Sequence, residues 1–304
     1  MAILVTGAAG FIGHAVAEAL HARGSRVVGT DAVLPEDPAF AFVQADLADA
    51  AGLAAIVAAH DVDAIVHCGA ISGPMLARDR PDLVVAVNIG GTTALLEQAR
   101  RRGMARFVFC SSAQAYGDTG PAPVGEDSPF NATDMYGASK AACDLVMRAY
   151  RVQHGLSALA LRISYAYGPG RRTACAVRTM LADALAGRPT RLDWGCGHER
   201  AYLFRDDAVG GVIAALDAPA SAQPFYNLAS TEARTMDAIA ADVRALLPQA
   251  DIALGPGPNP LNYHRDTLDI TAAARDLGWR PRFDLKTGLV AYLDWMKARP
   301  ADRR

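Results

Sequence analysis

The sequence predicts an α/β protein in which helices cover both faces of a doubly wound parallel sheet. Short apolar runs alternate with segments of helical periodicity through the first half of the chain, and this alternation is typical of parallel sheets. A glycine-rich turn between the first apolar run and the first helical segment supports the same class. The pattern changes in the second half, where we expect a smaller α/β part.

The elements of the first half follow one another in a regular order. The predicted strands are apolar runs too short for helices, at residues 3–6, 26–31, 41–44, 64–68, 106–110 and 159–162. The predicted helices have apolar residues every three or four positions, at residues 11–21, 53–60, 81–102 and 136–154. Pro81 stands in the first turn of its helix, where its missing N–H leaves no bond unmade.

Glycine–proline breaks divide the second half into shorter pieces, at residues 168–169 and 187–189. Helical patterns over residues 235–247 and 288–295 lie there among short strands. We expect residues 1–164 to form a first domain and residues 165–304 to form mainly a substrate-binding part. Residues near 203–229, around 206–216 and 225–227, are expected to return to the first domain.

Composition and charge exclude several classes of protein. The chain has 304 residues, of which 51% are hydrophobic and 20% charged, so it can bury a sizeable core. Its 30 basic and 32 acidic residues give no broad field for nucleic acid. No apolar run approaches the roughly 20 residues that span a bilayer, and the first residues lack the basic segment of a signal peptide. We therefore expect a cytoplasmic protein with neither a nucleic-acid nor a membrane partner.

Cysteine usage indicates free thiols and no metal site. The five cysteines are widely spaced and include no CxxC pair. An odd number at such spacings matches neither a disulfide framework nor a zinc site. They stand at positions 68, 110, 143, 175 and 196.

A turn with the sequence TGAAGFIG, residues 6–13, joins the first strand to the first helix. Gly7 permits a tight turn, Gly10 lets the backbone approach a pyrophosphate, and Gly13 lets the helix pack closely on the strand. The helix N-terminus adds free N–H groups and a partial positive charge. The GxxGxxG spacing differs from the commonest fingerprint, but its place between strand and helix predicts a dinucleotide site.

An acidic residue, Asp31, ends the second strand, 18 residues after Gly13. A carboxylate there accepts hydrogen bonds from the hydroxyls of an adenosine ribose and repels a 2′-phosphate. Residues 32–34 are Ala-Val-Leu and provide no arginine for such a phosphate. The sequence therefore predicts NAD rather than NADP as the cofactor.

Tyr136 and Lys140 stand four residues apart at the start of a predicted helix, so they share one face. A phenol is a poor base at neutral pH, and a nearby ammonium favours its ionised form. Such a phenol can take a proton from a substrate hydroxyl while hydride leaves the same carbon. Lysine occurs only at 140, 286 and 297 among the 30 basic residues, which indicates that position 140 needs a compact ammonium.

Ser112 follows the predicted strand 106–110, at the strand end that faces the ligand crevice in parallel sheets. Its hydroxyl can hydrogen-bond the reacting oxygen and align it with Tyr136. Ser111 is the competing candidate for this role. The loop at residues 71–76, with its Ser-Gly-Pro, is placed to touch substrate through Ser72 or to serve only as a connector.

Together these residues resemble the NAD-dependent epimerase/dehydratase family of the extended short-chain dehydrogenase/reductase superfamily. The likeness covers nearly the whole chain. It rests on TGAAGFIG (6–13), HCGA (67–70), VNIGGT (87–92), SSAQAYG (111–117), YGASK (136–140), LRISYAYGPG (161–170), GHER (197–200) and LGWRP (277–281).

The resemblance implies an NAD-dependent enzyme with a Rossmann-type sheet, often a homodimer through the helices over 81–102 and 136–154. The implied catalytic residues are Ser112, Tyr136 and Lys140. The implied cofactor-binding residues are Gly7, Gly10, Phe11, Ile12, Gly13, Asp31, Asp46, Leu47, Cys68, Gly69, Ala70 and Asn88, together with Tyr136 and Lys140. The candidate substrate-binding residues are Ser112, Gln114, Tyr165, Arg200 and Arg265, together with Ser72 of the loop described above, and the resemblance matches Arg200 to an arginine that contacts a substrate diphosphate.

Two positions depart from the family pattern. Family dehydratases carry an Asp-Glu pair after the catalytic hydroxyl, where this chain has Ala113 and Gln114. Elimination needs an acid and a base on the sugar ring, so we expect no 4,6-dehydratase activity. Nucleotide-sugar members usually carry asparagine three residues after the arginine that matches Arg162, and here Tyr165 stands instead.

Three functions therefore remain open at the level of sequence. The favoured one is a nucleotide-sugar epimerase similar to UDP-glucose 4-epimerase, which retains NAD and recycles it through a keto intermediate. The second is an NAD-dependent dehydrogenase of a free sugar, sugar acid or polyol. The third is a non-catalytic protein that binds and senses NAD on the same fold.

Overall fold

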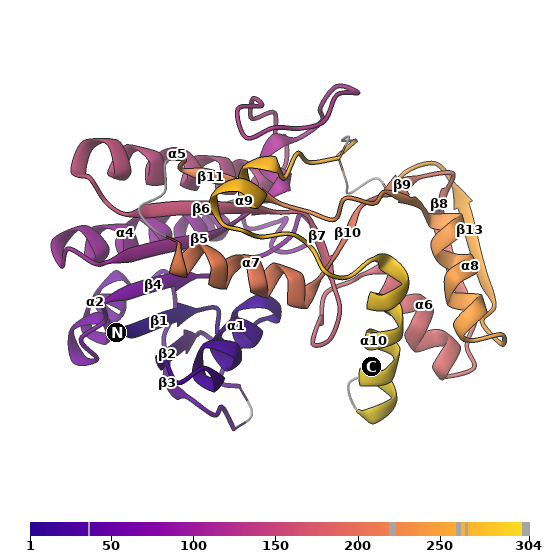
Figure 1. Cartoon of the computed structure of the whole chain (residues 1–304), viewed down its shortest axis with the longest axis horizontal. Helices are drawn as coiled ribbons and strands as arrows, with labels where there is room; N and C mark the ends of the chain where they lie inside the picture. Colours follow the sequence, from indigo (N-terminus) through magenta and orange to yellow (C-terminus); the bar gives the residue numbers. More distant parts are fainter. Residues whose placement is uncertain (36, 219–222, 260–262, 265–266, 300–304) are drawn as a thin grey trace.

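The computed structural model describes residues 1–304 except 36, 219–222, 260–262, 265–266 and 300–304. Among the described residues, seven parallel strands form one sheet in the order β11-β6-β5-β4-β1-β2-β3 (Figure 1). Their bounds are β1 Ala2–Thr6, β2 Arg26–Asp31, β3 Ala41–Gln44, β4 Ala64–His67, β5 Arg106–Ser112, β6 Ala158–Ile163 and β11 Phe225–Leu228. The predicted parallel α/β class is confirmed.

Helices cover both faces of this sheet because its strands are apolar on both sides. Ile3 and Val5 of β1 join the core beneath one set of helices, while Leu4 between them joins the core beneath the other. The first set is α1 (Phe11–Ala22), α7 (Arg205–Asp217) and α9 (Thr271–Asp276). The second set is α2 (Ala50–Ala59), α4 (Gly91–Arg101) and α5 (Met135–His154).

The helix predicted over residues 81–102 contains an irregular turn. It consists of α3 (Pro81–Val84), a π-helical segment η1 (Val85–Gly90) and α4. Such wide turns are frequent near functional sites. This one carries Asn88, whose side-chain amide is buried and whose contacts are described below.

Aspartate side chains set the beginnings of several helices. Asp49 accepts a hydrogen bond from the backbone N–H of Gly52 (2.9 Å), so α2 begins three residues before the predicted start. Asp134 accepts one from Gly137 N–H (2.9 Å) and fixes the start of α5. The first turn of α5, which carries Tyr136, is thereby held in place.

A second core lies beyond the carboxyl edge of the sheet, on the right in Figure 1. It is built from helices and three short two-stranded sheets, β7 with β10, β9 with β12 and β8 with β13. The strands are β7 Tyr165–Tyr167, β8 Thr190–Cys196, β9 Glu199–Arg200, β10 Tyr202–Phe204, β12 Arg234–Thr235 and β13 Ile252–Pro256. The helices are α6 Ala176–Leu185, α8 Met236–Leu246 and α10 Leu285–Ala298.

A buried polar network joins the last strands of the main sheet to the helix behind them. Arg162 of β6 is 1% exposed and donates from Nε to Asp144 of α5 at 2.8 Å. Its Nη1 donates to the hydroxyl of Tyr116 (2.8 Å), which in turn donates to the Asn227 side chain of β11 (2.8 Å). The guanidinium also lies 4.1 Å from the ring centroid of Phe225.

The imidazole of His67, at the end of β4, is fully buried between two threonines. Its Nδ1 lies 2.6 Å from the Thr6 hydroxyl and its Nε2 lies 2.9 Å from the Thr92 hydroxyl. Burial, assisted by the Lys140 charge, lowers the pKa of His67 to about 3. The ring is therefore neutral at physiological pH.

No helix within the described ranges is long and apolar enough to cross a membrane.

Candidate active site

A cleft of about 650 Å³ lies along the carboxyl ends of the strands. The cleft is lined by the turn after β1 and by residues at the ends of the next strands. These are Asp31 at the end of β2, Cys68 directly after β4 and Ser112 at the end of β5. Residues 171–173 of the second half close the far side. Ligands of open parallel sheets bind at this edge, where the strand order reverses.

The glycine turn has the shape that a pyrophosphate needs. Gly7 has φ of +68°, and a Cβ there would lie 2.6 Å from the backbone nitrogen of Gly69. A Cβ on Gly13 would collide with the Gly7 carbonyl oxygen. Helix α1 begins at Phe11 after Gly10, which has no side chain to cap it, so the first N–H groups remain available to an anion.

Acidic residues line the opposite end of the cleft from the catalytic candidates. Asp31 accepts hydrogen bonds from the backbone N–H groups of Ala9 (3.1 Å) and Val33 (3.3 Å), which orient its carboxylate. Asp46 and Leu47 line the cleft beside it. A ribose and an adenine fit the donor and acceptor character of this end.

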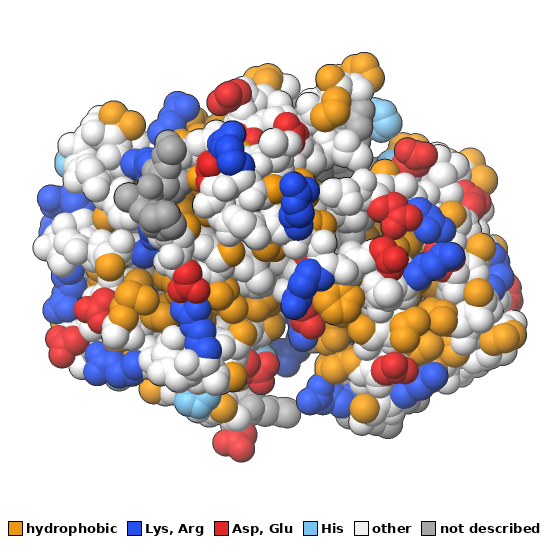
Figure 2. Space-filling view, viewed as in Figure 1, with side chains coloured by type: hydrophobic (Ala, Val, Ile, Leu, Met, Phe, Trp, Pro, Cys, Tyr) orange, Lys and Arg blue, Asp and Glu red, His pale blue; other side chains and the backbone are white. Residues whose placement is uncertain are grey.

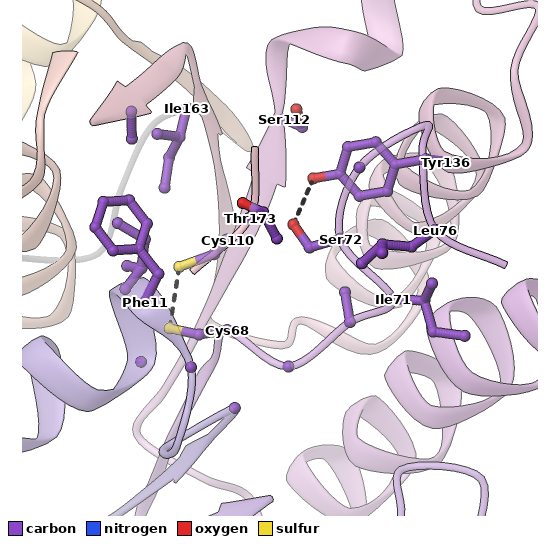
Figure 3. Close-up of a pocket in the computed structure, with 18 of the residues that line it drawn as sticks. Phe11, Cys68, Ile71, Ser72, Leu76, Cys110, Ser112, Tyr136, Ile163 and Thr173 are labelled. Atoms are coloured by element: carbon purple, nitrogen blue, oxygen red, sulfur yellow. Dashed lines mark hydrogen bonds between the residues drawn. The ribbon is translucent and has the colours of Figure 1, made fainter. Parts of the chain in front are cut away.

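Tyr136, Lys140 and Ser112 come together at the other end of the cleft. Lys140 is buried and donates from Nζ to the Cys110 carbonyl oxygen at 2.7 Å. The Tyr136 hydroxyl accepts a hydrogen bond from Ser72 at 3.5 Å, and Figure 3 shows these two oxygens facing each other. Ser112 accepts a bond from the backbone N–H of Gln114 (3.1 Å).

The start of α5 is pressed against the turn that follows Ser112. That turn is the 3₁₀ segment η2, Ala113–Tyr116. A Cβ on Gly137 would lie 2.6 Å from the Gln114 carbonyl oxygen, so only glycine allows this approach. The close packing brings the tyrosine of α5 to the same side of the cleft as the serine of β5.

Asn88 is placed behind the cleft wall, and it is not among the described residues that line the cleft. Its side-chain oxygen accepts from Ile71 N–H (2.8 Å), and its NH₂ donates to Ile71 O (3.2 Å) and to the Ser139 hydroxyl (2.9 Å). The amide therefore holds the loop that carries Ser72. Its predicted contact with the cofactor remains a prediction.

The predicted substrate residues are only partly brought together. Tyr165 lines the cleft, whereas Arg200 is not among the described residues that line it. Arg200 stacks on Tyr165, with the guanidinium carbon 4.8 Å from the centroid of the tyrosine ring. Arg171 stacks at 4.7 Å from the same ring and donates to Ala166 O. Arg265 lies outside the described residues.

Sequence reasoning missed the arginines at 171 and 172, which line the cleft with Thr173. Their position directly after the Gly168–Gly170 break was the available signal.

Two thiols also face each other in the wall, those of Cys68 and Cys110, with 3.3 Å between the sulfur atoms (Figure 3). Their hydrogen bond, followed by burial, raises the pKa of Cys68. The described part of the chain contains no group of three or more His, Cys, Asp or Glu side chains suited to a metal ion.

A family model for the NAD dependent epimerase/dehydratase family matches residues 3–229. The chain belongs to this family. It is an NAD-dependent enzyme with a Rossmann-type sheet, as the sequence predicted. The non-catalytic alternative is thereby set aside.

Family relatives match this chain over almost its whole length. A UDP-glucose 4-epimerase of Mycolicibacterium smegmatis is 30% identical over 311 residues, covering 98% of this chain and 99% of that protein. A dTDP-glucose 4,6-dehydratase of Streptomyces antibioticus is 31% identical, covering 98% and 92%. The crystal structure of Thermus thermophilus UDP-glucose 4-epimerase with NAD superposes with a TM-score of 0.87 at 28% identity, covering 98% and 100%.

Proposed function

We propose that this family member is a nucleotide-sugar epimerase of the UDP-glucose 4-epimerase type. It oxidises one hydroxyl-bearing carbon of the sugar and then reduces the resulting ketone from the other face. The observation that carries the proposal is the single cleft that has a dinucleotide turn at one end and Ser112, Tyr136 and Lys140 at the other. The names of relatives such as the M. smegmatis epimerase support the same class of substrate.

NAD, when bound, supplies the acceptor and donor of the hydride. The glycine turn would hold its pyrophosphate and Asp31 its adenosine ribose. Tyr136 exchanges a proton with the substrate hydroxyl, and Ser112 hydrogen-bonds the same oxygen and orients it. Lys140, fixed by the Cys110 carbonyl, places a positive charge beside the tyrosine, with Nζ 5.9 Å from the ring centroid.

Residues after the serine argue against a dehydratase. Ala113 is buried and has no acidic or basic group, and Gln114 carries an amide that does not exchange protons at neutral pH. No general acid for loss of a sugar hydroxyl is therefore supplied at these two positions. Interconversion of stereoisomers needs only the tyrosine proton and the hydride.

Tyr165 favours a second candidate, an NAD-dependent dehydrogenase of a free sugar, sugar acid or polyol. Its ring lies against the guanidinium groups of both Arg171 and Arg200, and its hydroxyl donates to Ala174 O at 3.3 Å. Arg200 stacks on this ring and is not among the described residues that line the cleft. A smaller substrate without a diphosphate would not need that arginine.

Product analysis of the purified protein tests the proposal. We expect NAD to copurify, UDP-glucose and UDP-galactose to interconvert as followed by NMR, and no NADH to accumulate. Tyr136→Phe should lower the rate by about 10²- to 10⁴-fold while NAD remains bound. Tyr150→Phe is a matched control on the same helix, since that hydroxyl bonds only weakly to Glu97 (3.4 Å) and is remote from the cleft lining.

Other results would decide between the candidates. Steady NADH release with a free aldose or aldonate, without interconversion of any nucleotide sugar, would establish the dehydrogenase. Full activity of Tyr136→Phe would remove the tyrosine from the mechanism in either case.

We further propose that the protein is a homodimer through α5 and the segment formed by α3, η1 and α4, which pack side by side. These elements expose Val85 (44%), Leu145 (43%) and Val152 (78%). Leu145 and Val152 are seven residues apart on α5 and so share one face of the helix, and exposed apolar side chains that lie together mark interaction surfaces. Light scattering after size exclusion should give twice the chain mass. Leu145→Glu should give monomers and Val290→Glu, on α10, should not; a monomeric wild type would contradict the proposal.

A further inference from the structure

Two cysteines from neighbouring strands meet in the wall of the cleft. The register of β4 and β5 pairs His67 with Phe109, so the next residues are Cys68, directly after the end of β4, and Cys110 of β5. Their sulfur atoms are 3.3 Å apart. Adjacent strands lie about 4.8 Å apart, which is within the Cα separation of about 4.4–6.8 Å that disulfides span.

The other cysteines lack such a partner arrangement among the described residues. Cys143 is buried and donates to the Asn88 carbonyl oxygen at 3.3 Å. Cys175 is buried and Cys196 is exposed on β8. Cys68 and Cys110, in contrast, both line the cleft, and Cys68 is the more exposed of the two. A small reagent that enters the cleft therefore meets Cys68 first.

We propose that Cys68 and Cys110 form a reversible disulfide when a peroxide enters the cleft in the absence of the dinucleotide. The Cys68 thiol is oxidised by the peroxide to a sulfenic acid, and one water leaves. The Cys110 thiol then attacks that sulfur, which forms the S–S bond and releases a second water. The peroxide accepts the two electrons, and a dithiol reductant returns them to the protein.

The bond would act on the groups that hold cofactor and substrate. The Cys110 carbonyl accepts the hydrogen bond of Lys140, and Ser112 is two residues further along β5. Cys68 precedes Gly69, whose backbone approaches the Gly7 turn. Closing the bond shortens the distance between the sulfur atoms from 3.3 Å to about 2 Å, and the side-chain and local backbone adjustment that this requires displaces both features. Oxidation therefore weakens NAD binding and lowers activity, whereas bound dinucleotide covers Cys68 and protects the pair.

The reaction is slow at neutral pH. The hydrogen bond to Cys110 and burial raise the pKa of Cys68, and the thiolate is the form that peroxide oxidises. The pair therefore responds to sustained exposure to peroxide.

Peptide mapping after treatment with hydrogen peroxide tests the proposal, on protein from which copurified NAD has first been removed. Trypsin releases Cys68 in the peptide 27–78 and Cys110 in the peptide 107–140, each with no other cysteine. We expect these peptides to become cross-linked with loss of two hydrogen atoms, and dithiothreitol to separate them. Excess NAD should suppress the cross-link. Activity and NAD affinity should fall together, activity by about 10²-fold as expected for misplaced catalytic groups, and both should recover on reduction.

Two variants supply the comparison. Cys110→Ser should yield no cross-link and should keep its own starting activity under peroxide far longer than the wild type does. Cys196→Ser removes an exposed lone thiol and should behave as the wild type. Peptides that stay separate until the protein unfolds would overturn the proposal, as would a cross-link that leaves NAD affinity and activity unchanged. The peptide map decides even if Cys110→Ser does not fold, and it does not depend on which sugar the enzyme uses.

Discussion

Replacing Asp144 by asparagine should strongly destabilise the protein, because it leaves the Arg162 guanidinium buried without its counter-charge. The two side chains are 1% and 0% exposed, and they are joined by a bond of 2.8 Å. Breaking a buried pair from one side typically costs about 3–5 kcal/mol, out of a total of about 5–15 kcal/mol for a folded protein. Loss of solvent, only partly offset by Arg162, raises the pKa of Asp144.

The assay is a double-mutant cycle followed by urea unfolding. The free energies of unfolding of Asp144→Asn, Arg162→Met and the double variant are compared with that of the wild type. The double variant should lose much less stability than the two single variants lose together. The control is the exposed ion pair of Arg191 and Asp251, whose Nη2 and Oδ2 atoms are 2.6 Å apart. Asp251→Asn should leave the free energy of unfolding unchanged within error.

A loss below about 1 kcal/mol for Asp144→Asn would refute the reasoning, since it would mean that water or another group compensates the guanidinium. Strict additivity in the cycle would equally show that the two side chains act independently.

Three more predictions concern the cofactor end of the cleft and the core beneath it. Asp31→Ala combined with Ala32→Arg should shift preference from NAD toward NADP, measured as the ratio of their dissociation constants; a wild type that binds both equally would show that Asp31 does not discriminate. Gly13→Ala should abolish detectable NAD binding in titration calorimetry, because the new Cβ collides with the Gly7 carbonyl oxygen. A variant that binds NAD with wild-type affinity would contradict the role of this glycine in the turn. Burial lowers the pKa of His67 from 6.5 to about 3, so the unfolded chain binds a proton at higher pH than the folded protein does, and the stability should fall as the pH drops from 6.5 toward 3. His67→Gln should reduce the pH slope of the unfolding free energy in this range by up to about 1.4 kcal/mol per pH unit. An unchanged slope would contradict a neutral buried ring.

Apolar periodicity located the middle of each element better than its ends. The strands predicted at residues 26–31 and 41–44 coincide with β2 and β3. The helix predicted at 288–295 begins instead at Leu285, after the cap Asp284. Caps are set by single polar side chains outside the apolar pattern, so periodicity alone does not reveal them. The wide turn at Val85–Gly90 likewise has no periodic signal.

Site features carried by one short segment, or by the carboxyl ends of parallel strands, were accessible from the sequence. Contacts that depend on how distant side chains are placed were not. The glycine turn and the spacing of Tyr136 and Lys140 are local patterns whose geometry follows from a strand–turn–helix and from one helical turn. Cys68 and Cys110 are 42 positions apart, and their contact depends on the order of strands in the sheet. The stacking of Tyr165 on Arg200 requires two separate strands to be placed first.

The path of the chain through the main sheet limits how this enzyme can be recombined with its relatives. After β6 the chain builds much of the second core and then returns, so that β11 forms the sheet edge and Asn227 completes the network around Arg162. A chimera with one crossover near residue 164 would combine an edge strand from one parent with a neighbour from the other. A chimera that exchanges substrate specificity therefore needs at least two crossovers, so that α7 and β11 come from the same parent as the cofactor-binding residues 1–164.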